Sequence, residues 1–285
     1  AGVLKKLDYI NELGADAVYM NPISKSYQNC GYGTTDYNQI EPTFGNGELL
    51  KKLTAAAHNK NMKLMTDVVL YFSPETSIYN NSSGINPFLG ALQSKESEYL
   101  SFFNVKNWPE YEGTEWGGLY TNLFDSSLRK LLYKTQNSAL QRLIREYGVD
   151  GLRFDCGGWL GSKTDFEKHN SLIKDIRADL KDASQNTLIL SENDIGGMTG
   201  YGWDSQWNLD LRVALNAYAT GVQPELSGYN TSASGLRDVL VRSLNYFPRQ
   251  QALTFYNMIS FHDGDRIDTK SASGRAATLV QMTYI

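Results

Sequence analysis

The sequence predicts an α/β fold built on a parallel β-sheet, either open or closed into a (β/α)8 barrel. Short apolar segments alternate with longer segments whose apolar residues recur at helical spacing, along nearly the whole chain. Strands that alternate with helices in this way are typical of parallel sheets. Four of the apolar segments also carry a carboxylate at or near their end, and functional groups gather at the carboxyl ends of the strands in (β/α)8 barrels.

The predicted elements follow one another in a regular order. The first helical pattern stops at Gly14, and the short apolar run after it predicts the first strand. The predicted helices span residues 3–13, 48–59, 127–147, 166–180, 209–218, 236–247 and 275–282. The predicted strands span residues 17–20, 62–69, 151–154, 188–192, 203–208 and 257–263.

One connection is too long for a simple strand–helix–strand unit. The chain between Val69 and Gly151 is more than twice as long as a βαβ unit of ~30 residues requires. Its middle part is rich in Asn, Ser, Gly, Pro and aromatic residues. We therefore predict a first barrel part at 1–72, an inserted subdomain at 73–118 and a second barrel part at 119–285.

Asp155 is the first candidate for a chemical role. It follows the short apolar strand at 151–154, so its side chain and that of Arg153 point to the same side. A cation two residues before a carboxylate favours the ionised form, which a nucleophile needs. A buried ion pair that merely closes the strand is the alternative, and this segment alone leaves both interpretations open.

Three further strands resemble that arrangement. Glu192 ends the strand at 188–192, the pair His262 and Asp263 ends the strand at 257–263, and Asp67 lies near the end of the strand at 62–69. Each carboxylate alone could be a helix cap or a solvated loop residue. Charged groups are rarely left in strands without partners, so the four together indicate a functional site.

Composition excludes some classes of function. The 285 residues include 27 basic and 31 acidic residues, which gives a net charge of −4. Without an excess of basic residues, binding to the phosphates of a nucleic acid is not expected. No apolar run approaches the ~18 residues of a membrane-spanning helix. Aromatic residues make up 12% of the chain, which suits a saccharide site and equally an ordinary core. An α/β hydrolase is set aside because no Gly-x-Ser-x-Gly motif occurs.

The two cysteines do not form a metal signature, which needs more ligands at characteristic spacing. Cys30 and Cys156 are predicted to be free buried thiols near the site. A disulfide between them is the alternative that the sequence leaves open.

The motifs taken together resemble the α-amylase family of glycoside hydrolases, family 13. The resemblance runs along nearly the whole chain, and some segments are similar to neopullulanase and cyclomaltodextrinase types, others to trehalose-releasing members. The segments that carry it are YINELGADAVYMNP (9–22), CGYGTTDY (30–37), LMTDVV (64–69), GLRFD (151–155), LSEN (190–193) and FHD (261–263).

The resemblance implies a retaining hydrolase of α-glucans or malto-oligosaccharides that needs no cofactor. The expected bond is α-1,4, and cleavage of α-1,6 bonds or release of trehalose are the alternatives. The catalytic roles fall on Asp155 as nucleophile, Glu192 as general acid and base, and Asp263 as the third carboxylate. The substrate-binding roles fall on Tyr32, Asp67, Arg153 and His262. An α-glucan transglycosylase with the same carboxylates and an inactive carbohydrate-binding homologue are the alternatives.

Several positions depart from the family pattern. The family's Asn-His pair after its first motif is Tyr71 and Phe72 here, so a calcium site at Tyr71, where the ligand Asn usually stands, is not expected. The family often has Lys-His where this chain has Gly158 and Trp159. Trp159 is predicted either to stack on a sugar or to pack beneath the cleft.

The resemblance also implies that the fold is the closed (β/α)8 TIM barrel, with the strand at 62–69 as its third strand and the insertion directly after it. About six of the eight strands are then visible, and the chain would be truncated at both ends. An incomplete barrel has open strand edges, so we expect these 285 residues alone to express poorly or to be inactive.

Overall fold

The computed structural model describes residues 1–162, 164–192, 202–222, 231–246, 249–258, 260, 262–263, 267 and 270–283. The chain divides into two compact units, Ala1–Ile189 and Leu190–Ile285. Each unit has its own set of elements and its own buried residues, and each is described by itself below.

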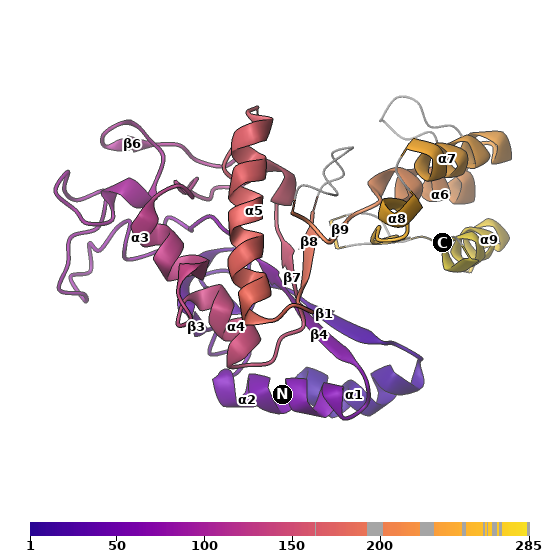
Figure 1. Cartoon of the computed structure of the whole chain (residues 1–285), viewed down its shortest axis with the longest axis horizontal. Coiled ribbons are helices and arrows are strands. Elements are labelled where there is room, and N and C mark those ends of the chain that lie inside the picture. The colour runs from indigo at the N-terminus through magenta and orange to yellow at the C-terminus, as the bar shows by residue number, and fades with distance from the viewer. Residues whose placement is uncertain are drawn as a thin grey trace. The chain divides into compact units, whose positions relative to one another are not determined.

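The first unit contains the elements from α1 to the start of β8 (Figure 1). Its helices are α1 (Gly2–Glu12), α2 (Gly47–His58), α3 (Ser126–Arg129), α4 (Ala139–Arg145) and α5 (Phe166–Ala183), with the short turns η1 (Leu100–Phe102), η2 (Lys130–Lys134) and η3 (Gly157–Trp159). Its strands are β1 (Ala17–Met20), β2 (Ser24–Ser26), β3 (Thr34–Ile40), β4 (Lys63–Val68), β5 (Val105–Asn107), β6 (Glu110–Tyr111), β7 (Gly151–Phe154) and β8 (Leu188–Ser191).

A parallel sheet forms the centre of this unit. Its strand order is β1-β4-β7-β8, with Ala17 opposite Lys63 in the first pair and Asp67 opposite Arg153 in the second. The Leu188 N–H donates to the Asp150 carbonyl at 2.9 Å, which places the start of β8 beside β7. The predicted α/β fold with a parallel sheet is therefore confirmed.

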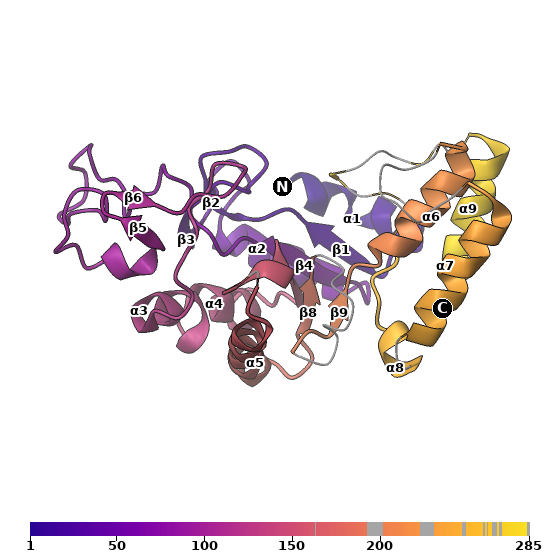
Figure 2. The same cartoon turned by 90° about the horizontal axis from the view of Figure 1, so that it is seen from above.

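Helices cover the sheet with their apolar faces. The buried residues of α5 recur every three or four positions and include Leu172, Ile173, Ile176 and Leu180, which is the spacing of one helix face. Helix α5 packs beside α4, and α1 packs beside α2 (Figure 1, Figure 2). Strand β7 is buried along its whole length, as expected for a parallel strand covered on both faces.

The predicted single helix at 127–147 is wrong, because the segment is divided into α3, η2 and α4. Arg129 and Lys134 both form ion pairs with Asp175 of α5, and the Tyr133 hydroxyl donates to the same carboxylate at 2.9 Å. The π-helical turn η2 ends at Lys134, and α4 begins only at Ala139, directly after its N-cap residue Ser138. Three bonds to one carboxylate thus fix a turn that the apolar spacing does not reveal.

Asp150 joins the start of β7 to β4. Its carboxylate accepts from the Leu64 N–H at 2.9 Å and from Lys63 at 3.0 Å, and it pairs with His58 at 2.7 Å. The Asp150 N–H donates in turn to the Leu64 carbonyl at 2.8 Å. This reciprocal pairing sets the register that carries through to Asp155.

The long connection after β4 contains the turn η1, the β5–β6 hairpin and many loops. Aromatic rings pack together at its base: Phe72 and Phe103 are tilted with centroids 5.8 Å apart, and Tyr79 and Tyr111 meet edge to face with centroids 5.0 Å apart. Phe72 and Leu119 form an antiparallel bridge, so the connection begins and ends at neighbouring points. Its predicted boundaries, 73–118, stay a prediction.

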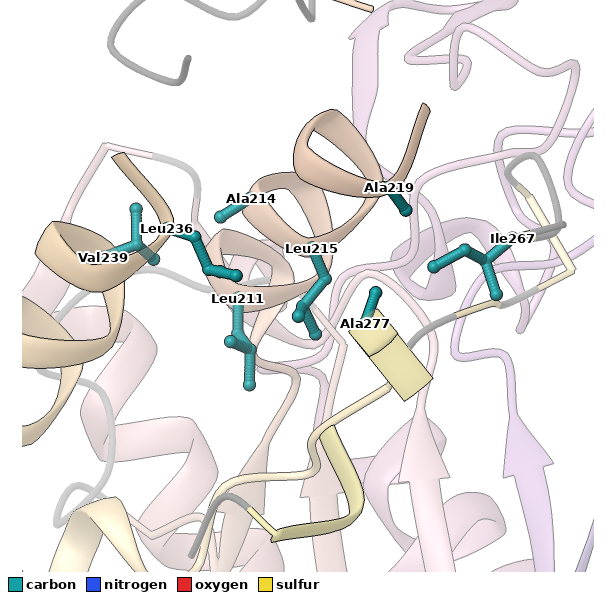
Figure 3. Packing of buried hydrophobic residues seen from close by; sticks show 8 residues of the cluster. All are labelled: Leu211, Ala214, Leu215, Ala219, Leu236, Val239, Ile267 and Ala277. Atoms are coloured by element: carbon teal, nitrogen blue, oxygen red, sulfur yellow. The ribbon is translucent and has the colours of Figure 1, made fainter. Parts of the chain in front are cut away.

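The second unit contains the end of β8, β9 (Ser205–Gln206), α6 (Leu209–Thr220), α7 (Ala233–Tyr246), α8 (Arg249–Ala252) and α9 (Ala272–Thr283). Leu190 and Ser191 of β8 pair in parallel with Ser205 and Gln206. Helix α6 contacts both α7 and α9, and the apolar side chains of this packing are shown in Figure 3: Leu211, Ala214, Leu215, Ala219, Leu236, Val239, Ile267 and Ala277.

The predicted strand at 257–263 is corrected. The described residues of this segment form no strand, and the nearest pairing is one parallel bridge between Trp207 and Tyr256, just before the segment. Residues 259 and 261 lie outside the described residues. His262 and Asp263 stand in a turn. Within the described ranges, no helix is both long and apolar enough to cross a membrane.

Candidate active site

Asp155 stands directly after β7, as predicted. Its N–H donates to the Val68 carbonyl at 2.9 Å, which extends the β4–β7 pairing by one residue. Cys156 then adopts a left-handed conformation with φ 50° and turns the chain into η3. The Asp155 side chain keeps 10% of its surface exposed. The carboxylate is therefore held by the sheet and still accessible at the end of a strand.

Arg153 contacts Asp155, as the period-two pattern predicts, and also bonds to a second carboxylate that the pattern did not predict. Its Nη1 donates to Oδ1 of Asp155 at 2.8 Å and also bonds to Oδ2 of Asp67. The Arg153 side chain is fully buried. A buried cation that bonds to a carboxylate fixes its orientation and favours the charged form that a nucleophile needs, so the bond from Arg153 suits Asp155 to that role.

Asp67 is fully buried, since its side chain has no exposed surface, and its predicted substrate-binding role stays a prediction. Oδ2 accepts from the hydroxyl of Tyr32 at 2.6 Å and from that of Tyr19 at 2.8 Å. Oδ1 accepts from the Val68 N–H at 2.9 Å. Sequence reasoning missed Tyr19, whose only signal was a tyrosine in an otherwise apolar strand.

Tyr32 reaches Asp67 from the loop between β2 and β3. A Cβ atom on the preceding Gly31 would lie 2.2 Å from the Pro22 carbonyl oxygen, and Gly31 has φ +93°, so glycine is required there. Burial raises the pKa of Tyr32, and the charge of Asp67 raises it further. The phenol therefore stays protonated and donates to the carboxylate, while its half-buried ring remains the predicted sugar contact.

Tyr71 contacts Asp155, which sequence reasoning did not foresee. Its hydroxyl donates to Oδ2 of Asp155 at 3.0 Å. Burial, followed by the charge of Asp155, raises the pKa of Tyr71, so the hydroxyl remains a donor. Because this hydroxyl is committed to Asp155 and Phe72 is a buried hydrocarbon ring, these two residues do not fit a calcium site at this position.

Trp159 packs against a second indole. The rings of Trp159 and Trp116 are nearly parallel, 19° apart with centroids separated by 6.2 Å. Trp116 also contacts Tyr71, with centroids 6.2 Å apart. The three rings line a small cavity of about 40 Å³, together with Cys156. Trp116 is 44% exposed, so this aromatic wall presents part of its surface to solvent.

Both cysteines are free. The prediction of free thiols is confirmed, but the prediction that both are buried is wrong for Cys30, which is exposed. Cys156 is partly buried and belongs to the turn that follows Asp155.

The remaining predicted residues belong to the second unit. Glu192 follows the end of β8 and is partly buried, and the Ser191 hydroxyl donates to its carbonyl at 2.8 Å. His262 and Asp263 pair at 3.0 Å, and the His262 ring meets Trp207 edge-on with centroids 6.2 Å apart. The first unit thus brings together Asp67, Arg153, Asp155 and Tyr32, while the convergence of Asp155 with Glu192 and Asp263 stays a prediction.

Comparison with known proteins supplies the family. The chain matches the family model for the alpha amylase catalytic domain over residues 1–282, and this match implies a (β/α)8 barrel. A solved cyclomaltodextrinase is similar to the structure with a TM-score of 0.82 and 24% sequence identity, covering 99% of this chain and 47% of that one. At this level of sequence identity, the similarity supports the fold alone.

Two curated relatives agree with the family match. The maltogenic alpha-amylase of Bacillus acidopullulyticus is 27% identical over 276 residues, covering 94% of this chain and 44% of that protein. Neopullulanase 2 of Thermoactinomyces vulgaris is 27% identical over 300 residues, covering 100% and 47%. The chain spans about half the length of the curated relatives it matches. With the family model matched almost from end to end, the chain belongs to the alpha-amylase family.

Proposed function

We propose that the chain is the catalytic part of a retaining glycoside hydrolase that cleaves α-glucosidic bonds, chiefly α-1,4. The observation that carries the proposal is the state of Asp155: Arg153 holds one carboxylate oxygen at 2.8 Å and Tyr71 holds the other at 3.0 Å. A carboxylate that is ionised, oriented and still partly accessible suits a nucleophile. Membership of the alpha-amylase family supports the same chemistry.

The reaction proceeds in two displacements. An oxygen of Asp155 attacks the anomeric carbon while Glu192 protonates the departing glycosidic oxygen, so that a covalent glycosyl–enzyme forms. Glu192 then removes a proton from water, and the water oxygen attacks the anomeric carbon. The bond to Asp155 breaks, its electron pair returns to the carboxylate, and the anomeric configuration of the product is that of the substrate.

The remaining predicted residues hold the sugar. Asp263 and His262 would bond to the hydroxyls of the reacting ring, and Tyr32 would lie against its apolar face. Asp67 is assigned a positioning role, because its buried carboxylate holds Tyr32 and Arg153 rather than solvent. Trp159 and Trp116 would support a neighbouring sugar with their exposed surface.

The names of the relatives support a substrate class. Similar proteins are named maltogenic alpha-amylase, cyclomaltodextrinase and neopullulanase. These names support an α-glucan or malto-oligosaccharide as the substrate of this chain. The finer architecture belongs to the same proposal: a barrel of which about six strands lie within the chain, interrupted at 73–118 by an inserted subdomain.

Covalent trapping tests the proposal. The protein is incubated with a fluorinated α-glucosyl donor and digested, and the masses of its peptides are measured by mass spectrometry. We expect one added glucosyl group on the peptide that contains Asp155, and no adduct in Asp155→Asn. An adduct elsewhere, or none with the unaltered protein while α-glucan is still cleaved, would contradict the assignment. Products longer than the substrate from maltotriose would indicate transfer to sugar instead of water.

A further inference from the structure

We infer that Tyr71 is a positioning residue for Asp155, one that holds the second carboxylate oxygen and assists its departure from the glycosyl–enzyme. The inference rests on the proposed function and deepens it, because it adds a phenol to the groups that act on the nucleophile. Tyr71 and Asp155 are separated by 84 positions in the sequence and are joined by one bond of 3.0 Å.

The two carboxylate oxygens of Asp155 accept hydrogen bonds from different residues. Arg153, two residues earlier on β7, donates to Oδ1 at 2.8 Å. Tyr71, three residues after β4 ends, donates to Oδ2 at 3.0 Å. Since β4 and β7 are neighbours in the parallel sheet, the two donors rise from adjacent strand ends. Rotation of the carboxyl group would break at least one of these bonds, so the pair fixes its orientation.

The phenol itself has little freedom to move. Immediately after Tyr71, the Phe72 N–H donates to the Leu119 carbonyl at 3.3 Å, and the Leu119 N–H donates back at 2.7 Å. This bridge draws Gly118 against the ring, where an added Cβ would lie only 2.6 Å from Cδ2 of Tyr71. Trp116 covers another part of the ring at 6.2 Å between centroids. The absence of a side chain at Gly118 therefore leaves the space that the ring occupies.

The bond acts differently on the two chemical steps. When Asp155 becomes an ester, it loses its charge, and a hydrogen bond to a neutral ester is weaker than one to a carboxylate. When water later attacks the anomeric carbon, the carbon–oxygen bond breaks and the charge returns to Asp155. The Tyr71 hydroxyl stabilises that returning charge and keeps its own proton throughout, while the proton of the water passes to Glu192.

The test separates the two steps in the protein expressed from its full gene. The fluorinated donor first traps the glycosyl–enzyme, excess donor is removed, and recovery of activity measures how fast the intermediate turns over. Removal of one hydrogen bond to a charged group is expected to slow recovery in Tyr71→Phe about tenfold. Trapping should be slowed less, because the free carboxylate loses a stabilising bond at the same time as it loses orientation.

Two further variants complete the experiment. Tyr111→Phe removes an equally buried tyrosine hydroxyl, one that donates to the Ala91 carbonyl at 2.5 Å, and should leave recovery unchanged. Gly118→Ala keeps the Tyr71 hydroxyl but displaces its ring, so recovery should slow as in Tyr71→Phe. Combined with Tyr71→Phe, Gly118→Ala should add no further slowing, because both act on the same bond.

The outcomes are distinct. A normal adduct on Asp155 with unchanged recovery in Tyr71→Phe would overturn the inference and leave the proposed function standing. Equal slowing in Tyr111→Phe would also overturn it, since the effect would then follow from general loss of packing. Failure of the unaltered protein to form any adduct on Asp155 would overturn the proposed function, and the inference with it.

Discussion

Asp67 and Arg153 face each other across β4 and β7 as register partners, and their side chains form an ion pair with no exposed surface. The same nitrogen of Arg153 also bonds to Asp155, two residues further along β7. The orientation of Asp155 is therefore set by the pairing of two strands. Charges buried to this extent are costly unless every partner is present, so the three residues depend on one another.

Removal of the shared cation should be severe. Arg153→Met leaves two buried carboxylates without their counter-ion, and we expect the free energy of unfolding to fall by about 3–5 kcal/mol. Urea denaturation measures the loss. Arg145→Met is the control, because Arg145 and its partner Asp182 are 30% and 74% exposed and such pairs contribute about 0–1 kcal/mol. Adding Asp67→Asn to Arg153→Met should restore part of the stability; simple addition of the two losses would contradict the coupling.

Loss of either reacting carboxyl group should abolish turnover without unfolding the protein. Asp155→Asn removes the attacking charge and Glu192→Gln removes the transferable proton, so each is expected to retain less than about 1% of activity on malto-oligosaccharides. Asp165→Asn is a matched control, since Asp165 caps α5 through its side chain and asparagine caps equally well. Activity above a few per cent in the Asp155 or Glu192 variant, with a normal melting curve, would reverse the assignment.

The aromatic wall should affect binding more than chemistry. Trp116→Ala and Trp159→Ala each remove a ring from the stacked pair, and ring stacking of about 0.5–1.5 kcal/mol predicts a KM raised roughly two- to tenfold with kcat nearly unchanged. Steady-state kinetics on maltotriose measure both constants. Trp108→Phe, whose indole N–H donates to the Ala91 carbonyl at 3.1 Å, should leave KM unaltered. A lower melting temperature with an unchanged KM would assign Trp159 to packing alone.

Asp150 should make stability depend on pH. Burial raises the pKa of Asp150, but bonds from the Leu64 N–H, His58 and Lys63 outweigh burial, so the pKa lies below its ordinary value. The stabilisation is therefore complete above the unfolded value of about 4 and disappears as the pH falls through the lower folded value.

The corresponding variant gives a clear measurement. At pH 7, Asp150→Asn should lower the free energy of unfolding by about 1–2 kcal/mol, and the difference from the unaltered protein should shrink below about pH 4. Asp182→Asn, at a carboxylate that is 74% exposed, should show little difference at either pH. A difference for Asp150→Asn that persisted unchanged into acid would show that the charge is not responsible.

Sequence periodicity was sufficient to predict the contacts and strand bounds that depend on residues close together in the chain. Arg153 and Asp155 lie two residues apart on a strand, so their shared direction follows from alternation alone, and the structure joins them. The resemblance likewise led to Asp67 and Tyr32, which form a bond of 2.6 Å. Strands β1, β4, β7 and β8 all begin and end within one residue of their predicted bounds.

Long-range contacts explain what the sequence did not reveal. Tyr71 follows an apolar strand and is typical of a core residue; only its partner, 84 positions away, gives its hydroxyl a role. Trp116 lies in an irregular loop without periodicity. The break between α3 and α4 depends on Asp175, 41 residues beyond Lys134, so the apolar spacing of 127–147 alone could not predict it.

The acidic and basic partners Asp67, Arg153 and Asp155 depend on paired strands, whereas Trp116 is carried by a loop of the long connection after β4. That connection can change in length or sequence without disturbing the reacting charges as long as the bridge between Phe72 and Leu119 and the small residue at position 118, which hold Tyr71 in place, are kept. In such a protein the preferred sugar and the reaction chemistry are encoded largely by separate stretches of the gene, and new preferences can arise while the chemistry is conserved.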